Sequence, residues 1–170
     1  PFAPETNAAG RCRPAARTTP DIFQLHEMLH QMSAAGARAI VMEVSSHALA
    51  QQRIGSLRFD VAAFTNLTQD HLDYHRSMSA YFDAKRALFD RLKPAERRAA
   101  APFVIGIDDE WGARLAGALQ ARGDDVLTTS ACGSAAALLA AHSVRVDTRG
   151  SSFALRYRGN DAGTVRTPLL

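Results

Sequence analysis

The sequence contains little cysteine, little lysine and no long apolar run. Its two cysteines, Cys12 and Cys132, lack Cys-x-x-Cys spacing and so indicate neither a disulfide framework nor a zinc knuckle. No uninterrupted apolar stretch approaches the roughly 20 residues of a transmembrane helix. Residues 1–17 lack the apolar core of a signal peptide. We therefore expect a cytoplasmic protein that is not inserted into a membrane.

Basic residues exceed acidic ones only slightly. The 20 Lys and Arg against 17 Asp and Glu give a net charge of +3, and no Lys/Arg run is longer than two residues. Nucleic-acid-binding proteins carry clustered basic faces, so we expect no nucleic-acid partner. With 46% hydrophobic residues, a chain of 170 residues can build the core of one domain. We expect it to be a monomer.

The order of apolar patterns predicts the fold class. Thr19, Pro20 and Asp21 predict a helix start, with Thr19 as the cap, and Gly36 predicts its end. The other predicted elements are strands at 39–44, 60–64 and 103–107, a short helix through residue 53, a loop through residue 75, a helix around Lys85 closed by Pro94, and a helix at 109–121. The alanine-rich segment 131–141 is closer to a helix than to a membrane span. Beyond Ala141, alternating residues and glycine turns predict an antiparallel meander. The sequence thus predicts an α/β fold with a mainly parallel sheet flanked by helices and an antiparallel segment at its C-terminal end.

Polar residues gather at the ends of two predicted strands. The first strand carries Glu43 and runs into Ser45, Ser46 and His47. The second runs into T-N-L-T-Q-D-H-L-D-Y-H, whose acids and imidazoles are Asp70, His71, Asp73 and His75. In open α/β sheets, ligands bind at the carboxyl ends of the strands. These residues are therefore candidates for a functional site.

One lysine lies in the middle of an apolar helical stripe. The stripe consists of Met78, Phe82, Lys85, Phe89 and Leu92. The Lys85 stem could simply pack while its ammonium group reaches water. Alternatively, desolvation favours the neutral amine, which can act as a nucleophile or take up carbon dioxide as a carbamate. Because Lys85 and Lys93 are the only lysines in an arginine-rich chain, we favour the chemical role.

Four ordered motifs resemble the central, P-loop-like domain of the Mur ligase family, and within it the branch that adds the third residue of the peptidoglycan stem peptide. They are T-T-P-D at 18–21, M-E-V-S-S-H-A-L at 42–49, T-N-L-x-x-D-H-L-D-Y-H at 65–75 and A-K-x-x-L-F at 84–89. A weaker match continues through I-D-D-E-W-G at 107–112. Any one motif alone would be a weak signal, whereas four in order make a strong one.

The resemblance implies an ATP-dependent ligase that joins an amino acid, meso-diaminopimelate or L-lysine, to UDP-MurNAc-L-Ala-D-Glu. It also implies Mg²⁺ held by Glu43, His71 and Lys85 as a carbamate, and these residues are the candidate catalytic set. Positions that match the family's dipeptide site are Thr18, Thr19, Ser45, Gln51 and Arg53. Simpler roles are open for several of them: Glu43 as a structural acid, Thr19 as a helix cap and Arg53 as a surface residue.

The sequence departs from the family pattern in three places. No G-T-N-G-K-T phosphate loop precedes Thr18, and no C-terminal domain follows Leu170. We therefore expect residues 1–170 to be a partial central domain without the N-terminal domain, phosphate loop and C-terminal domain, and to be inactive alone. In addition, Gly106 stands where family members carry an Asn that meets adenine.

Two rival functions remain open from the residues alone. His71, Asp73 and His75 could form the ligand set of a metal-dependent hydrolase that needs no ATP. The chain could instead be a non-catalytic fragment that only binds the nucleotide-linked dipeptide.

Overall fold

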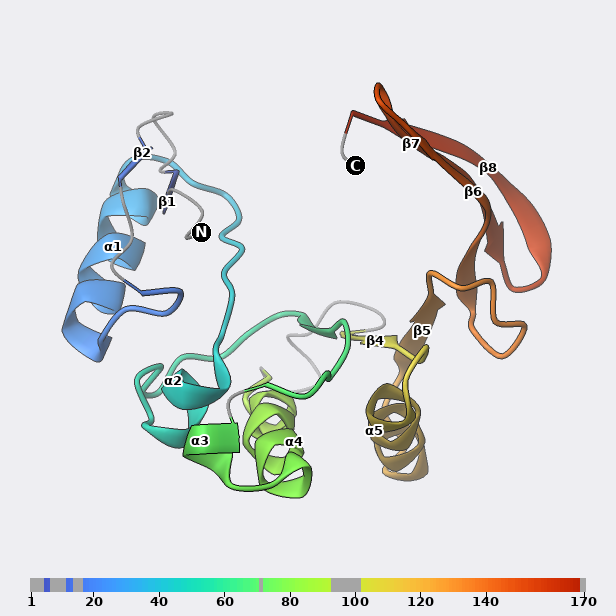
Figure 1. Cartoon of the computed structure of the whole chain (residues 1–170). Helices are drawn as coiled ribbons and strands as arrows, with labels where there is room; N and C mark the ends of the chain where they lie inside the picture. Colours follow the sequence, from blue (N-terminus) through green and yellow to red (C-terminus); the bar gives the residue numbers. More distant parts are fainter. Residues whose placement is uncertain (1–4, 7–11, 14–16, 71, 93–101, 169–170) are drawn as a thin grey trace. The chain divides into compact units, whose positions relative to one another are not determined.

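The computed structural model describes residues 5–6, 12–13, 17–70, 72–92 and 102–168 (Figure 1). The chain divides into two compact units. Unit 1 comprises Pro1–Arg58 and His71–Arg91, and unit 2 comprises Phe59–Asp70 and Leu92–Leu170. Among the helices of the described ranges, none combines the length and apolar character needed to cross a membrane.

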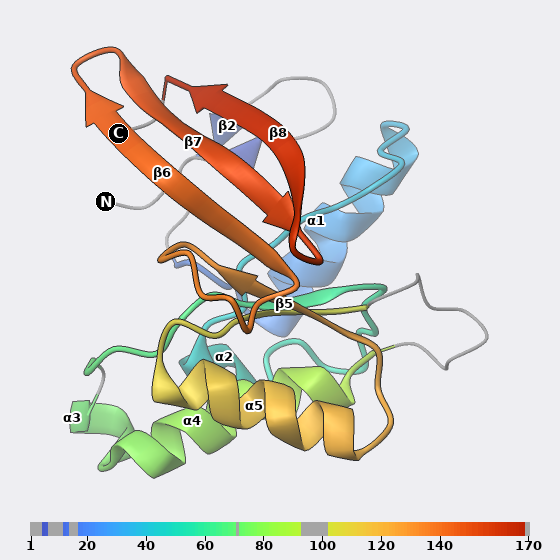
Figure 2. The ribbon, with the colours of Figure 1, turned by 90° about the vertical axis from the view of Figure 1, so that its right-hand side faces the viewer.

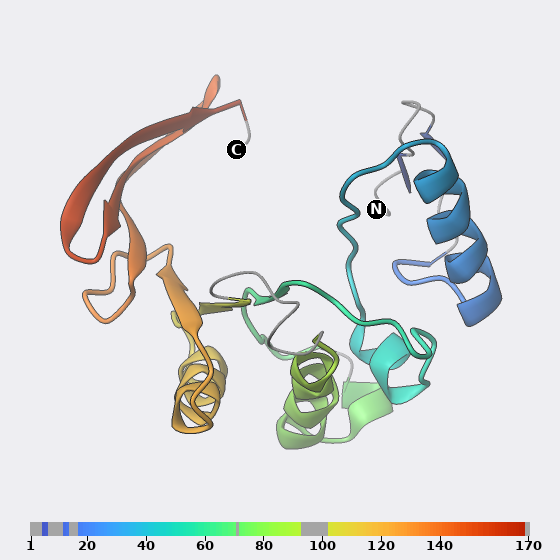
Figure 3. The same cartoon turned by 180° about the vertical axis from the view of Figure 1, so that it is seen from behind.

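Unit 1 is mainly helical. Its elements are the antiparallel pair β1 (Glu5–Thr6) and β2 (Cys12–Arg13), followed by α1 (Ile22–Ala34), α2 (Ser46–Ala50), α3 (Leu72–His75), α4 (Met78–Arg86) and the 3₁₀ helix η1 (Ala87–Asp90). Helix α4 contacts α2, α3 and η1, and Figure 3 shows this group of short helices. The apolar side chains of Ile54, Phe82 and Phe89 are buried in this unit.

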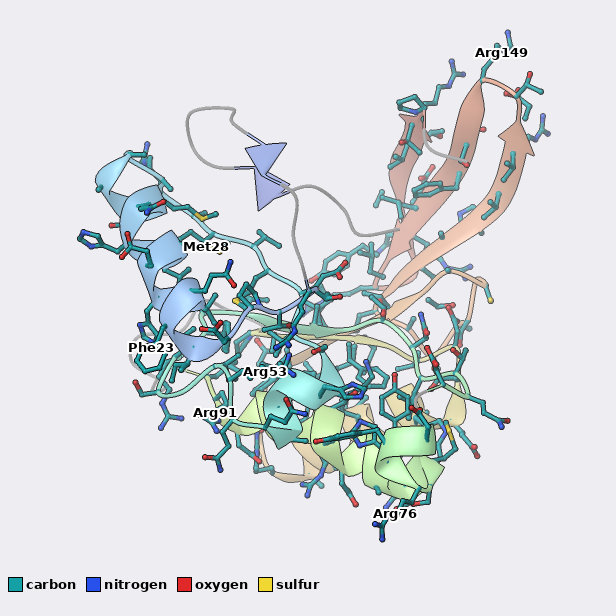
Figure 4. All side chains as sticks on the ribbon, turned by 60° about the vertical axis from the view of Figure 1, so that its left-hand side comes forward. Phe23, Met28, Arg53, Arg76, Arg91 and Arg149 are labelled. Atoms are coloured by element: carbon teal, nitrogen blue, oxygen red, sulfur yellow. The ribbon has the colours of Figure 1, made fainter. Side chains whose placement is uncertain are left out.

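Helix α1 begins two residues later than predicted, because its N-cap is Asp21 and not Thr19. Asp21 is the N-cap, and its carboxylate accepts hydrogen bonds from the backbone N–H groups of Phe23 and Gln24, each at 3.0 Å. The prediction that Thr19 caps this helix was wrong, because the Thr19 hydroxyl bonds elsewhere in the chain. The predicted end at Gly36 is confirmed, with a left-handed φ of +86° that suits glycine. Phe23 points outward from α1 (Figure 4).

The predicted strand at 39–44 does not form in the described structure. This segment has no ladder partner among the described strands, and its side chains include Val41, which is 98% exposed. A β-type apolar run becomes a strand only when a neighbouring strand satisfies its backbone groups. The pattern therefore identified a segment with strand propensity but could not supply the partner.

Unit 2 contains a six-stranded mixed sheet in the order β3-β4-β5-β6-β7-β8. The strands are β3 (Ala62–Phe64), β4 (Phe103–Gly106), β5 (Val126–Ser130), β6 (Leu139–Asp147), β7 (Gly150–Tyr157) and β8 (Asn160–Thr167). Strands β3 to β6 pair in parallel, while β6, β7 and β8 form an antiparallel meander (Figure 2). Helix α5 (Glu110–Ala121) contacts β4 and β5. The predicted α/β class with its antiparallel C-terminal segment is confirmed.

Three predicted elements differ from the structure. The alanine-rich 131–141 is not helical, because the Ser130 hydroxyl accepts the backbone N–H groups of Cys132 and Ser134 and turns the chain before β6 begins at Leu139. The predicted loop through His75 contains the short helix α3. The helix that carries Lys85 ends at Arg86 and tightens into η1, while its predicted terminator, Pro94, lies outside the described residues.

Candidate functional site

A buried threonine joins the T-T-P-D motif to the M-E-V-S-S-H motif. Thr19 is 1% exposed. Its hydroxyl donates to the backbone carbonyl of Glu43 and accepts the backbone N–H of Ser45, both at 3.0 Å. Because buried polar groups need partners, this single hydroxyl fixes the course of the chain from Glu43 to Ser45. Thr18, its neighbour, is exposed.

Helix α2 follows directly from this connection. Ser45 is its N-cap, and the hydroxyl oxygen accepts the backbone N–H of Ala48 at 3.2 Å. After the helix, Gln52 adopts a left-handed φ of 53°, which turns the chain back. Arg53 then donates to the Thr19 carbonyl at 3.4 Å and to the Gln51 side-chain oxygen. Four of the five predicted dipeptide-binding residues are thus linked by hydrogen bonds around the start and end of α2.

Aromatic rings and imidazoles extend this network toward α4. The Gln51 amide donates to the Tyr74 hydroxyl at 3.3 Å. The Tyr74 ring centroid lies 4.2 Å from that of His47 and 4.8 Å from that of His75. The His75 ring is stacked on Tyr81, with centroids 5.0 Å apart and an interplanar angle of 20°. These contacts form a continuous path from α2 through α3 to α4.

Lys85 lies at the end of that path. Its side chain is half-buried, and its Nζ lies 5.1 Å from the Tyr81 ring centroid. This distance falls within the range of a cation–π contact. Phe82 and Phe89 of the predicted stripe are buried in unit 1, but only Met78 and Phe82 share α4 with Lys85, because the chain passes into η1 before Phe89.

The predicted metal ligands are only partly described. The Glu43 side chain is exposed, and His71 lies outside the described residues. Within the described ranges, no cluster of three or more His, Cys, Asp and Glu side chains could hold a metal ion. The assignment of Glu43, His71 and Lys85 to a metal therefore stays a prediction.

A second polar cluster ends strands β4 and β5 in unit 2. The Asp109 carboxylate caps α5 through the N–H of Gly112 at 2.7 Å and also accepts the N–H of Leu67 at 2.8 Å. Asp108 accepts the Ser130 hydroxyl at 2.5 Å and the Ala131 N–H at 2.7 Å. Partial burial raises the pKa of Asp108, but the hydrogen bonds from Ser130 and the adjoining backbone outweigh it and lower the pKa below its ordinary value of 3.8.

Gly106 occupies a position with no room for a side chain. A Cβ atom there would lie 2.3 Å from the backbone oxygen of Thr65, at the end of the neighbouring strand β3. A Cβ atom on Gly112 would in turn lie 1.8 Å from the Gly106 oxygen. The two glycines allow β4 to approach both the loop after β3 and the first turn of α5.

Comparison with known proteins agrees with the motifs. Residues 4–170 match the model of the Mur ligase middle domain. The chain belongs to the Mur ligase family. It is 55% identical over 108 residues to the UDP-N-acetylmuramoyl-L-alanyl-D-glutamate--2,6-diaminopimelate ligase of Geobacter sulfurreducens. This aligned region covers 60% of this chain and 20% of that protein. The ligase of the same name from Xanthomonas campestris pv. campestris is 44% identical over 161 residues, covering 95% of this chain and 31% of that protein.

A solved structure resembles this Mur ligase domain as well. The structure of a UDP-N-acetylmuramoyl-L-alanyl-D-glutamate--2,6-diaminopimelate ligase matches it with a TM-score of 0.74 and 30% identity, over 90% of this chain and 30% of that chain. The chain therefore spans about a fifth to a third of the length of the relatives that it matches.

The geometry of the Mur ligase domain disfavours the rival hydrolase ligand set. His75 is 8% exposed and its Nε2 lies 2.9 Å from the Ser46 hydroxyl, whereas the Asp73 side chain is exposed. Residues two apart on a helix do not share a face, so Asp73 and His75 diverge on α3. The relatives reported above are named as ligases, and the hydrolase reading is not supported.

Sequence reasoning missed the roles of Tyr74 and Tyr81. Tyr74 lies in the motif at 65–75 and Tyr81 lies between it and the motif at 84–89, but only the contacts of their rings with His75 show why they matter. The available signal was their spacing: Tyr81 precedes Lys85 by four residues, one helical turn, on α4.

Proposed function

We propose that the chain is the middle domain of a MurE-type ligase that joins 2,6-diaminopimelate to UDP-MurNAc-L-Ala-D-Glu at the expense of ATP. The observation that carries the proposal is the hydrogen-bonded network at the two ends of α2, which brings together Thr19, Ser45, Gln51 and Arg53. The names of the Geobacter and Xanthomonas relatives support the choice of amino acid. A cytoplasmic location follows from the ATP requirement, and a monomer remains our expectation.

In this proposal the hydrogen-bonded network at the ends of α2 binds the anionic, nucleotide-linked dipeptide. Arg53 supplies a guanidinium, which suits carboxylate and phosphate oxygens because it can donate two parallel hydrogen bonds. Its contacts with Thr19 and Gln51 hold that group in place before the substrate arrives. Thr18, which precedes Thr19 in the sequence and is exposed, offers a further hydroxyl donor.

The reaction forms an amide bond in two steps. The D-glutamate carboxylate attacks the terminal phosphorus of ATP, which yields an acyl phosphate and ADP. The amine of the amino acid then attacks the acyl carbon, loses a proton and expels phosphate. Both steps gather negative charge near the transferred phosphoryl group, so the domain must place positive or polar groups there. No side-chain nucleophile is required.

The available donors fit a hard cation. Mg²⁺ prefers oxygen ligands, and the chain offers the exposed carboxylate of Glu43 together with Lys85, whose carbamate would present anionic oxygen. We propose that these residues, with His71, hold Mg²⁺, which when bound would neutralise phosphate charge. The carbamate explains why a lysine stands where metal binding would otherwise favour a carboxylate.

A chimeric ligase tests the proposal. The matching segment of the Xanthomonas campestris relative is replaced by this chain, and phosphate release from ATP is measured with UDP-MurNAc-L-Ala-D-Glu and meso-diaminopimelate. We expect release that requires both substrates, and Arg53→Ala should raise KM for the dipeptide. A folded chimera that binds the dipeptide but shows no substrate-dependent release would contradict the assignment.

The same chimera tests the lysine. Lys85→Ala and Lys85→Arg should each lower kcat by about 10²–10³-fold, as removal of one preorganised electrostatic group does in other enzymes. Arginine keeps the charge but cannot form a carbamate. Lys93→Arg is the matched control, since Lys93 is the other lysine of the chain. Near-normal turnover by the Lys85→Arg chimera would reduce Lys85 to a structural cation.

A further inference from the structure

Three side chains in unit 1 form a stack whose role the proposed reaction does not explain. Ser46, at the first position of α2, lies 2.9 Å from His75 Nε2 through its hydroxyl. The His75 ring also stacks on the Tyr81 ring of α4. The centroid of that Tyr81 ring lies 5.1 Å from Lys85 Nζ. Ser46 is 2% exposed, and His75 and Tyr81 are nearly as buried.

We propose that His75 is a positioning residue for Lys85, acting through the ring of Tyr81. The inference rests on the proposed role of Lys85, and it assigns to His75 a task distinct from metal or substrate contact. The Ser46 bond anchors the imidazole to α2, and the imidazole face sets the plane of the Tyr81 ring.

A lysine needs such help because its amine swings on a flexible four-carbon stem. Many rotamers are open to a half-buried lysine, and fixing it costs conformational entropy. An aromatic face one helical turn away offers a preferred place for the protonated amine, the form that Lys85 has before any carbamate is made. That place is fixed only if the ring itself is held, and stacking with His75 at 5.0 Å holds it.

The arrangement links two parts of the candidate site. Helix α2 carries Ser45 and is followed by Gln51 and Arg53, while α4 carries Lys85. His75, from α3, contacts both helices through Ser46 and Tyr81. The Lys85 amine is therefore held in a fixed position relative to α2, around which the predicted dipeptide-binding residues lie.

The scarcity of lysine makes a direct measurement possible. In the 170-residue chain labelled with [¹³Cε]lysine, the NMR spectrum should show two lysine signals, and Lys93→Arg identifies that of Lys85. Because Lys85 Nζ lies over the Tyr81 ring, 5.1 Å from its centroid, the ring current should shift the Lys85 signal upfield. Tyr81→Leu should return it to the position of an ordinary lysine.

Variants of His75 separate positioning from stability. His75→Asn keeps a polar partner for Ser46 but removes the stacked ring, so the Lys85 shift should collapse toward the ordinary value. His75→Phe keeps the ring and should retain most of the shift. His30→Asn, at an exposed histidine of α1, is the matched control and should change nothing. A merely structural histidine would lower the unfolding midpoint and leave the Lys85 shift of the folded protein unchanged.

The outcomes decide the proposal in each case. An unshifted Lys85 signal in the parent chain, or an unchanged shift in folded His75→Asn, overturns it. If His75→Asn fails to fold, Ser46→Ala tests the same anchor. The proposal is also overturned if the Lys85 shift survives in folded Ser46→Ala and is lost in folded His75→Phe. In the chimeric ligase, His75→Asn should lower kcat by up to about 10²-fold, the scale of an ångström-sized misplacement, with KM for the dipeptide unchanged.

Failure of the proposed function would look different. If Lys85→Arg left the chimera active, the catalytic role of Lys85 would fall. The His75-dependent chemical shift of Lys85 would then still report that His75 places this side chain.

Discussion

Gly106→Ala should destabilise unit 2 although it adds only one methyl group. The new Cβ would lie 2.3 Å from the Thr65 backbone oxygen and 3.2 Å from the Thr65 carbonyl carbon. Both atoms belong to the backbone at the end of β3, whose residues pair directly with β4, so neither can rotate away. Relief requires the two strands to separate at their ends.

The cost follows from the size of the overlap. Overpacking of a tight core typically costs about 1–3 kcal/mol. We expect the upper half of that range, because the clash falls on paired backbone and not on a flexible side chain. With a urea m-value of about 1–3 kcal/mol/M for a small protein, the unfolding midpoint should fall by roughly 1 M.

Fluorescence of Trp111 provides the assay. It is the single tryptophan of the chain, and it lies in the first turn of α5 within unit 2, so its urea transition reports on that unit. Gly117→Ala is the matched control: no atom lies within 4 Å of a Cβ there, and the position is inside α5. It should stabilise by about 0.5–1 kcal/mol, as alanine does when it replaces glycine in a helix. Equal midpoints for Gly106→Ala and the parent chain would refute the close-approach argument.

Two further changes test other parts of the structure. Thr19→Val leaves the Glu43 carbonyl and the Ser45 N–H without their partner and should cost about 1–3 kcal/mol by urea unfolding followed with circular dichroism, whereas Thr18→Val at the exposed neighbour should change the free energy of unfolding by less than about 0.5 kcal/mol. The lowered pKa of Asp108 contributes stability that is present above pH 3.8 and is lost as the pH falls through the folded-state pKa. Ser130→Ala should therefore weaken that acid-induced loss, and an unchanged pH profile between about pH 5 and 3 would contradict the assignment.

The fold was predictable where periodicity and turns determine it. The meander beyond residue 141 follows from alternation around glycine turns, and the helix predicted at 109–121 is α5, with Asp109 as its N-cap. The strand at 39–44 could not be predicted correctly, because strand formation depends on a partner that an apolar run does not reveal. The alanine-rich segment 131–141 is not helical for a related reason. Hydrogen bonds to the Ser130 side chain outweigh the helix propensity of its alanines.

The sequence predicted which residues form the candidate site, a prediction that stays open, but it did not predict the hydrogen bonds that join them. Family motifs drew attention to Thr19, Ser45, Gln51 and Arg53, yet the sequence could not show that one threonine hydroxyl joins two motifs. The bonds of Thr19 span 24 and 26 residues, so a rule based on neighbouring residues assigned it a local cap. Tertiary hydrogen bonds of this kind override local preference, because a buried hydroxyl must be satisfied wherever its partners lie.

Tertiary contacts also explain Gly106, a residue that the family pattern alone marks as a missing asparagine. Compared with the family pattern, glycine there removes an amide that could meet adenine. The distances around Gly106 show that an asparagine could not be restored without moving Thr65, because even its Cβ would overlap that backbone oxygen. The loop after β3 is drawn inward further by the Leu67 N–H, which bonds Asp109, and Asp109 in turn holds the N–H of Gly112 at the start of α5. Glycine at 106 and glycine at 112 are thus two parts of one close packing, and any nucleotide contact at this strand end must come from the backbone or from a neighbouring side chain.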